Sequence, residues 1–361
     1  MREPWIDFGK SLGILLVVVG HNPYVWLQHP EVYKIILSFH VPLFFSLSGA
    51  TLNPEESLKS VFGRAASLIW VYVACALLSL PLVAGRGDAA NASLFDLLLG
   101  ILYGTGHTMH PGPLWFLPAL ALCLIFTWAV LQCFRLYLVG RSARRFACIA
   151  VFGLLVATLG TFAVSQFGFL ITDSFGWGSC RSSGCFWSFD LVLVGSGFVI
   201  FGYALKAIFA ANSDLASFRA LFVIGVTFAS SYLYFSPSVD IDSRRMIPLG
   251  GAVVVAALGV AFVFSLLKTI PVKNRIFLAI GSATLPVLAS HQFIQKKVLI
   301  ILSGDFNGAG FFEFVISVFC AVFVATVFNV LIAKKRVVGQ IVFYPREFCF
   351  WRRFFNKGCV R

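Results

Sequence analysis

The sequence predicts an all-α, polytopic integral membrane protein, a bundle of about ten transmembrane helices. Of its 361 residues, 59% are hydrophobic and 12% are charged, whereas about a quarter of the residues in soluble globular domains are charged. Apolar stretches of about 17 to 25 residues, each long enough to cross the hydrocarbon core as a helix, recur from one end to the other. The segments between them are too short for a soluble domain.

The expected helices follow one another with short connections. We place them at about residues 11–28, 32–52, 65–85, 113–134, 146–170, 187–208, 219–236, 248–267, 276–294 and 311–333. The even number puts both ends of the chain on one side of the membrane. The first apolar run is not expected to be a cleavable signal peptide, because Pro23 and His29 interrupt the residues after it and no small-residue cleavage site precedes the next helix.

The basic residues are sorted by side. Twenty-one of the 28 Lys and Arg residues fall on the N-terminal side of the expected bundle and seven on the other, so both termini are expected in the cytoplasm. This distribution explains the net charge of +13 without nucleic acid as a partner. We divide the chain into a transmembrane domain, residues 1–333, and a basic, aromatic cytoplasmic tail, residues 334–361, which is expected to lie on the membrane surface.

All six histidines fall in outer loops or outer parts of the expected helices, which points to an outward-facing polar centre. His21 lies well inside the first apolar segment, where an ionisable side chain is unfavourable unless it faces the bundle interior. Because imidazole titrates near neutral pH and accepts a proton from a hydroxyl, His21 is a candidate general base. The alternative is a packing histidine bonded to a neighbouring carbonyl.

Lys10 precedes His21 by eleven residues, and eleven helical steps return to within about 20° of the same face while rising about 16 Å. By itself, Lys10 would be an interfacial lysine that extends to water. Together, the two residues suit a long ligand with anionic phosphates at one end and a reactive group at the other, such as acyl-coenzyme A. Asp7, three residues before Lys10, is expected to pair with it.

Other membrane-level residues are candidates for the same centre. His40 lies in the outer half of the second expected helix. His110 and Trp115 stand at the Gly- and Pro-rich entry to the fourth, where Trp115 also fits an interfacial belt. His291 is a third membrane-level histidine, in the ninth helix.

Two features of the outer side leave alternatives open. Asp190 lies near the outer end of a long apolar segment and needs a partner there. It orients a histidine, binds a sugar hydroxyl, or pairs with Arg181 or Arg64. Cys180 and Cys185 share one outer loop, where they form either a disulfide or two incidental thiols.

Several ordered segments carry a family resemblance. They are Trp5-Ile6-Asp7-Phe8-Gly9-Lys10 with Gly20-His21, Phe39 to Phe45 with Ser48-Gly49, Arg64 before Leu68, Gly112 to Ala119, and Gly281 to Thr284 with His291. Together they resemble the membrane-bound acyltransferase-3 family, especially its fucose 4-O-acetylase-like branch, over most of the chain. The family often has Arg where this chain has Lys10, which keeps the positive charge but lacks the bidentate fork.

The resemblance implies an O-acetyltransferase of the bacterial inner (cytoplasmic) membrane. It would transfer an acyl group, usually acetyl, from cytoplasmic acyl-coenzyme A to a hydroxyl of a cell-surface or lipid-linked carbohydrate, such as an exopolysaccharide. Acetyl-coenzyme A or another acyl-coenzyme A is the expected donor. No metal is expected, because no two histidines have the i, i+4 spacing of a helical metal site.

The expected residue roles follow from this reaction. His21 is the base on the acceptor hydroxyl, with His40 and Asp190 positioning groups around it, and Lys10 and Arg64 hold the coenzyme A phosphates. The residues expected to contact the acceptor are Trp115, His110 and His291. Direct transfer and an acyl-histidine intermediate both stay open.

Two other functions stay open at this point. A transporter or flippase for a lipid-linked sugar would line its pathway with the same buried polar residues. A structural partner of polysaccharide-assembly machinery would not need Lys10 or His21. The expected partners are the lipid bilayer and a carbohydrate acceptor, either a polysaccharide repeat unit or a lipid-linked oligosaccharide.

Overall fold

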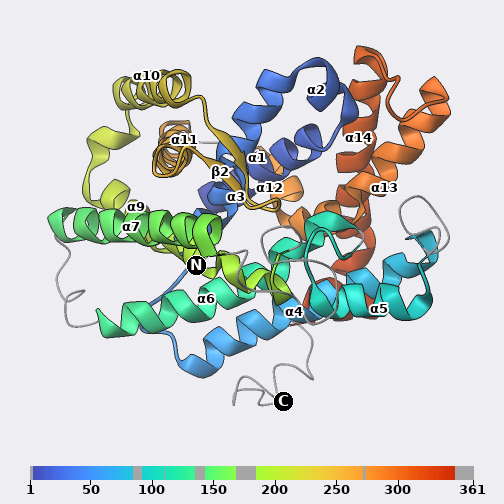
Figure 1. Ribbon diagram of the computed structural model, residues 1–361, viewed down its shortest axis with the longest axis horizontal. Coiled ribbons are helices and arrows are strands. Elements are labelled where there is room, and N and C mark those ends of the chain that lie inside the picture. The colour runs from blue at the N-terminus through green and yellow to red at the C-terminus, as the bar shows by residue number, and fades with distance from the viewer. Residues whose placement is uncertain are drawn as a thin grey trace.

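Helices make up most of the residues that the structure describes, as the ribbon diagram shows (Figure 1). The computed structural model describes residues 3–83, 92–109, 111–134, 143–167, 184–270 and 274–345. The long helices are α1 (Pro4–Gly20), α3 (Pro30–Ala50), α4 (Leu58–Val83), α6 (Phe116–Cys133), α7 (Ala143–Phe167), α9 (Val192–Ala211), α10 (Phe218–Phe235), α11 (Gly251–Thr269), α13 (Thr284–Ser303) and α14 (Phe311–Phe328). The shorter helices are α2 (Pro23–Gln28), α5 (Leu94–Tyr103), α12 (Arg275–Ser282) and α15 (Val337–Phe343).

The predicted class, an all-α polytopic membrane bundle, is confirmed. Within the described residues, eight helical stretches are long and apolar enough to cross a membrane, and the bent pair α12 and α13 makes a ninth. The remaining predicted segment folds as α1, whose 17 residues are at the lower end of the length that spans a bilayer.

The first segment is shifted from its predicted position. Residues 11–28 were expected to form one helix, but α1 begins at Pro4 and ends at Gly20. Pro23 lacks the N–H needed to continue a helix, and the side chain of Asn22 caps a new one by accepting a hydrogen bond from the backbone N–H of Tyr24 at 3.1 Å. His21 therefore stands at the end of α1 rather than within it.

The ninth segment is broken. The axes of α12 and α13 meet at 81° at Ala283. Pro286 explains the break, because in a continuous helix its ring would clash with the carbonyl of Ser282 four residues earlier. That carbonyl instead accepts a hydrogen bond from the hydroxyl of Tyr344 at 2.9 Å, so its hydrogen-bonding capacity is satisfied inside the membrane protein.

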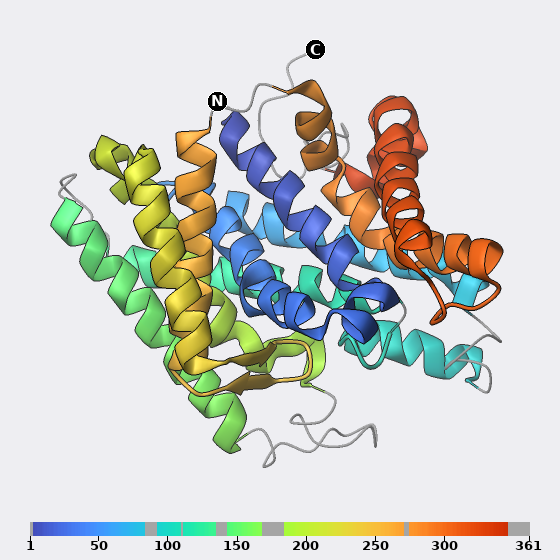
Figure 2. The ribbon, with the colours of Figure 1, turned by 90° about the horizontal axis from the view of Figure 1, so that it is seen from above.

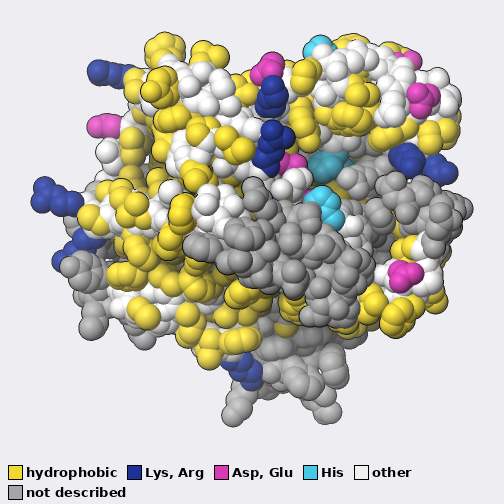
Figure 3. Space-filling model, viewed as in Figure 1, with side chains coloured by type: hydrophobic (Ala, Val, Ile, Leu, Met, Phe, Trp, Pro, Cys, Tyr) yellow, Lys and Arg dark blue, Asp and Glu magenta, His cyan; other side chains and the backbone are white. Residues whose placement is uncertain are grey.

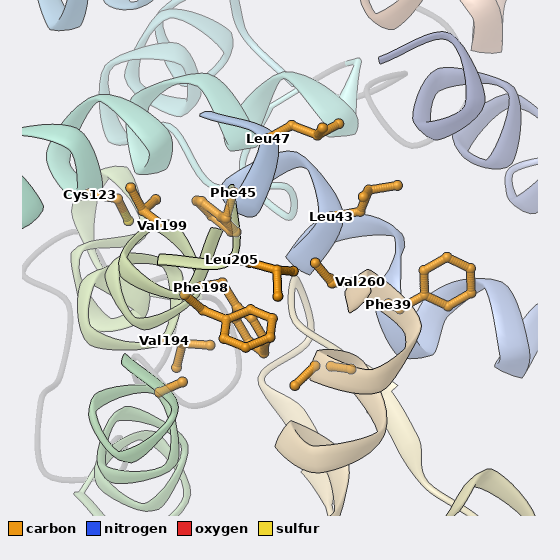
Figure 4. Close-up of a cluster of buried hydrophobic side chains, with 14 of the residues drawn as sticks. Phe39, Leu43, Phe45, Leu47, Cys123, Val194, Phe198, Val199, Leu205 and Val260 are labelled. Atoms are coloured by element: carbon orange, nitrogen blue, oxygen red, sulfur yellow. The ribbon is translucent and has the colours of Figure 1, made fainter. Parts of the chain in front are cut away.

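Small residues bring the central helices into backbone contact. A Cβ atom on Gly49 of α3 would lie 1.9 Å from the carbonyl oxygen of Val199 in α9, and one on Gly202 would lie 2.0 Å from that of Ser46. Such close approach is typical of helix pairs in membranes. Around this contact, apolar side chains of α3, α9 and α11 form a buried cluster (Figure 4).

A two-stranded hairpin lies across one side of the bundle. Strands β1 (Ser238–Asp240) and β2 (Arg245–Ile247) pair antiparallel, with Val239 opposite Met246. In Figure 2, α1 begins on the side opposite the hairpin. We call the side where α1 begins the N-terminal face and the opposite side the hairpin face.

Candidate active site

A cavity of about 980 Å³ follows α1 through the bundle. Eight residues before, within and directly after α1 line it. Six of them recur at alternating spacings of four and three, namely Glu3, Asp7, Lys10, Ile14, Val17 and His21, and Ile6 and Gly20 are the immediate neighbours of two of these. This spacing is one face of a helix, and its 18 steps rise about 27 Å, close to the thickness of the hydrocarbon core. The predicted stripe through Lys10 and His21 is therefore present, and it lines one cavity.

Two ion pairs stand at the N-terminal end of the cavity. Lys10 Nζ lies 3.7 Å from a carboxylate oxygen of Asp7, which confirms the predicted pair. Lys206 Nζ lies 2.5 Å from a carboxylate oxygen of Glu3. All four side chains line the cavity, so this end is polar, whereas Ile14 and Val17 further along α1 are apolar.

The break between α12 and α13 adds polar groups at the same end. Ser282 and Tyr344 line the cavity. The hydroxyl of Ser282 accepts hydrogen bonds from Lys334 Nζ at 2.9 Å and from the side-chain amide of Asn329 at 3.2 Å. Asn329 begins a π-helical turn, Asn329–Ala333, a geometry often found at functional sites.

Close packing fixes this end of α1 against α12. A Cβ atom on Gly281 would lie 2.0 Å from the carbonyl oxygen of Asp7. The hydroxyl of Ser11 donates to the carbonyls of both Asp7 and Phe277, one on each helix. The Asp7–Lys10 pair is therefore held against the helix break.

Arg64 lies beside this end, in an adjoining pocket of about 330 Å³ that shares Ser48, Thr51 and Tyr344 with the cavity. Its guanidinium pairs with the carboxylate of Glu56 at 2.7 Å, and both side chains are mostly buried. The structure thus brings Lys10 and Arg64 to the same region, although Arg64 does not line the main cavity.

Two histidines lie toward the other end. His21 Nδ1 is 2.9 Å from the carbonyl oxygen of Val17, and His40 Nδ1 is 2.9 Å from that of Ile36. A carbonyl only accepts, so each Nδ1 carries a proton, and in the neutral ring Nε2 is then a lone-pair acceptor. Both rings line the cavity, and the hairpin face shows histidine atoms in a recess near its centre (Figure 3).

The alternative role of His21, a packing histidine bonded to a neighbouring carbonyl, agrees with one of its contacts. Its Nδ1 bonds a carbonyl of its own helix, as a packing histidine would. That bond fixes the tautomer in which Nε2 can accept a proton, so the two roles are compatible, and the ring has the form required of a general base.

His291 lies behind His21 rather than in the cavity. Its side chain is fully buried and is absent from the cavity lining. Its ring meets that of His21 edge to face, with ring centroids 5.2 Å apart, while its Nδ1 bonds the carbonyls of Val287 and Leu288. His291, which was expected to contact the acceptor, therefore packs against His21 and does not line the cavity.

Asp190 is paired with a residue that sequence reasoning did not select. Its carboxylate oxygens accept hydrogen bonds from Arg244 Nε at 2.8 Å and Arg244 Nη2 at 3.1 Å. It also accepts one from the backbone N–H of Cys185 at 3.1 Å. Asp190 does not line the cavity, so its contact with the centre is indirect, through the hairpin that carries Arg244.

The other predicted residues divide between the cavity and the undescribed segments. Trp115 lines the cavity and is 6% exposed. His110 lies outside the described residues. Cys185 is disulfide-bonded, and Cys180, its predicted partner, also lies outside the described residues.

Sequence reasoning gave little weight to the acidic residues of the hairpin. Asp240 and Asp242 line the hairpin end of the cavity. Burial raises the pKa of the Asp242 carboxyl. In the sequence, the only signal was two carboxylates separated by one residue in a short loop, which is common on exposed surfaces. Among the residues that the structure describes, no group of His, Cys, Asp and Glu side chains is arranged to hold a metal ion.

Taken together, ion pairs line one end of the cavity, apolar side chains line its middle, and His21, His40, Asp240 and Asp242 line the other end. No curated protein and no solved structure matches the chain. Residues 3–334 match the profile of the acyltransferase-3 family, described as an acyltransferase domain. The match covers most of the chain, so the protein belongs to this family of membrane acyltransferases.

Proposed function

We propose that the protein is an O-acetyltransferase that moves an acetyl group from acetyl-coenzyme A to a hydroxyl of a cell-surface or lipid-linked carbohydrate. The donor enters at the N-terminal face, which we assign to the cytoplasm of a bacterial inner membrane, and the acceptor binds at the hairpin face. Within the family, this corresponds to the fucose 4-O-acetylase-like branch. The observation that carries the proposal is the single cavity lined by Lys10 at one end and His21 at the other.

The dimensions of the cavity suit such a donor. Lys10 and His21 are separated by about 16 Å along α1, so phosphates held near Lys10 leave the extended arm of coenzyme A to follow the apolar stretch between them. Lys10, Arg64 and Lys334 supply positive charge at the N-terminal end, and charge-assisted hydrogen bonds to phosphate are strong. The thioester then reaches the histidines.

The chemistry assigned to His21 balances without a further reagent. Its Nε2 takes the proton of the acceptor hydroxyl while the hydroxyl oxygen attacks the thioester carbonyl. The carbon–sulfur bond breaks, the acetyl group stays on the acceptor oxygen, and the released thiolate takes the proton from His21. His40, which also lines the cavity, orients the acceptor hydroxyl by accepting a hydrogen bond at its Nε2. An acetyl group carried first on His21 is the covalent version of the same sequence.

The test is transfer by purified protein in nanodiscs. Labelled acetyl-coenzyme A is supplied with oligosaccharides prepared from the host's own surface polysaccharide by mild alkaline deacetylation. His21→Ala should lower kcat by about 10²- to 10⁴-fold, the usual contribution of a general base. His29→Ala is the matched control, because His29 is exposed and does not line the cavity.

The cation end is tested by substrate dependence. Lys10→Met should raise KM for acetyl-coenzyme A with a smaller effect on KM for the oligosaccharide. Lys34→Met is the control, since Lys34 is half exposed and pairs with Glu31 outside the cavity. If His21→Ala transfers acetyl groups at the normal rate, the proposed mechanism is wrong.

A transporter or flippase for a lipid-linked sugar is the second candidate, because a cavity lined from one face to the other also suits a pathway. Family membership favours the enzyme. The two separate in proteoliposomes without acetyl-coenzyme A, where a transporter moves the lipid-linked sugar and the acetyltransferase leaves it unchanged.

A further inference from the structure

Two carboxylates, Asp240 and Asp242, line the cavity at the hairpin face. They take no part in the ion pairs at the N-terminal face, and the proposed reaction does not yet assign them a role. Both stand on or beside strand β1. Asp240 is close enough to interact electrostatically with His21, His40 and Tyr33. Asp240 therefore lies near His21, the residue proposed as the base.

The hydrogen-bonding capacity of these carboxylates is only partly used within the protein. Asp240 accepts bonds from the backbone N–H and the hydroxyl of Ser243, at 3.2 and 2.8 Å. Asp242 Oδ1 is buried and has no hydrogen-bond donor among the described residues, although Arg244 Nη1 lies 3.8 Å away. An ionised carboxylate has acceptor sites for about four hydrogen bonds, so both groups can accept from further donors.

A second polar group points into the same space. His40 is 8% exposed and lines the cavity. Its Nδ1 donates a hydrogen bond to the carbonyl oxygen of Ile36. Among the described residues, no side chain or backbone group forms a hydrogen bond with its Nε2. His40 and Asp242 thus offer a lone pair and a carboxylate oxygen to donors on a bound molecule.

The hairpin is anchored strongly for so short an element. The side chain of Arg244 is 1% exposed and that of Asp190 is 7% exposed, and the guanidinium donates two hydrogen bonds to the carboxylate. Arg244 also donates to the carbonyl of Asp242 and holds a backbone φ of +58°, which is unusual for a residue other than glycine. The anchor determines where the Asp242 carboxylate stands.

Glycine shapes the opposite wall. A Cβ atom on Gly106 would lie 2.2 Å from a carboxylate oxygen of Asp242. Only glycine leaves room for the carboxylate in this position. Gly106 on one side and the Arg244–Asp190 pair on the other therefore fix the position of the Asp242 carboxylate.

We propose that Asp240 and Asp242 form the acceptor-binding site, in which they accept hydrogen bonds from two hydroxyl groups of the carbohydrate and present a third hydroxyl to His21. Arg244 and Asp190 act as positioning residues for this site. The inference rests on the proposed acetyl transfer and assigns the acceptor to particular residues. Hydroxyl-rich molecules suit the site because each hydroxyl donates one hydrogen bond to a carboxylate.

The test measures KM for both substrates, labelled acetyl-coenzyme A and the alkali-deacetylated oligosaccharides, with the full-length protein in nanodiscs. Asp240→Asn and Asp242→Asn should each raise KM for the oligosaccharide about 10- to 100-fold, the effect of losing a hydrogen bond to a charged group. KM for acetyl-coenzyme A should stay within about twofold. Asp305→Asn, at an exposed aspartate outside the cavity, is the matched control.

A second variant covers the case in which Asp242→Asn does not fold. Gly106→Ala displaces the Asp242 carboxylate through the added methyl group and should raise the same KM. Hydrolysis of acetyl-coenzyme A without an acceptor reports on the donor half of the site and should be unchanged in the control variant Asp305→Asn. An unchanged oligosaccharide KM in Asp240→Asn and Gly106→Ala, or an equal rise in both KM values, overturns the acceptor assignment.

Failure of the proposed acetyl transfer and failure of the proposed acceptor site give different results. If the wild-type protein transfers no acetyl group to any oligosaccharide, the proposed function is wrong. If the wild-type protein transfers acetyl groups and the hairpin variants keep its oligosaccharide KM, only the acceptor site is wrong.

Discussion

Replacing Arg244 by Met should destabilise the protein by about 3 to 5 kcal/mol, because it removes one partner of a buried ion pair. The guanidinium is 1% exposed and donates two hydrogen bonds, at 2.8 and 3.1 Å, to the carboxylate of Asp190, which is 7% exposed. Without Arg244, that carboxylate stays buried and uncompensated. The loss of the bond to the Asp242 carbonyl adds to the cost.

A double-mutant cycle distinguishes the loss of the Arg244–Asp190 ion pair from a general loss of stability. Asp190→Leu alone leaves the buried guanidinium with only the more distant carboxylate of Asp242, 3.8 Å from Nη1, as a charged partner. The double variant Arg244→Met with Asp190→Leu buries neither charge of the pair and should recover much of the loss. We expect a coupling energy above about 1 kcal/mol between the two positions. Lys34→Met is the control, because Lys34 and Glu31 form an exposed pair, 51% and 69% exposed, whose removal should change stability by less than about 1 kcal/mol.

The measurement is unfolding in mixed micelles, followed by tryptophan fluorescence as denaturing detergent is added. The variants are compared at one protein and lipid concentration. Additive effects of Arg244→Met and Asp190→Leu, or a change in Arg244→Met no larger than in Lys34→Met, would refute the reasoning. In either case, the pair would contribute no more than a surface ion pair.

Three further predictions concern other parts of the cavity wall. Gly281→Ala should push α12 away from α1, because its Cβ would lie 2.0 Å from the Asp7 carbonyl oxygen, and should therefore clearly lower the unfolding midpoint. Gly308→Ala is the control and should leave the midpoint unchanged, because the nearest neighbour of its Cβ would be 3.4 Å away. Tyr344→Phe removes the donor to the Ser282 carbonyl, so it should cost about 1 to 3 kcal/mol in the same unfolding assay and raise KM for acetyl-coenzyme A. Burial raises the pKa of Asp242 from 3.8 to about 6, so its contribution to stability is present below the unfolded value and is lost as the pH rises through about 6. Asp242→Asn should therefore gain stability relative to the wild type on going from pH 4 to pH 8, and an equal difference in unfolding midpoint at both pH values would contradict this.

The helical periodicity of α1 was enough to predict half of the site. Lys10 and His21 lie on one face because of their spacing alone, and nothing distant is needed to place them together. The apolar segments likewise predicted each spanning helix, since lipid requires backbone hydrogen bonds to close within the segment. Local pattern and membrane physics therefore carried this part of the prediction.

The parts that the sequence left open depend on distant partners. Asp190 needed a cation, and it pairs with Arg244, 54 residues away, whereas Arg64 pairs with Glu56 and Arg181 lies outside the described residues. The break at Ala283 depends on Pro286, which is visible in the sequence, but also on Tyr344, which lies 62 residues from the carbonyl that it bonds. His291 was predicted as a membrane-level histidine, but only packing decides whether its ring faces the cavity or the ring of His21.

The apolar middle of the cavity also has an electrical consequence. A passage lined from one face of the protein to the other is a weak point in an insulating membrane. Between Lys10 and His21 the walls include Ile14, Val17 and Phe44, and an ion there would have to shed its water with nothing to replace it. Narrow apolar sections block conduction by drying out. The section proposed to admit the pantetheine arm of acetyl-coenzyme A would therefore also oppose the passage of protons and sodium.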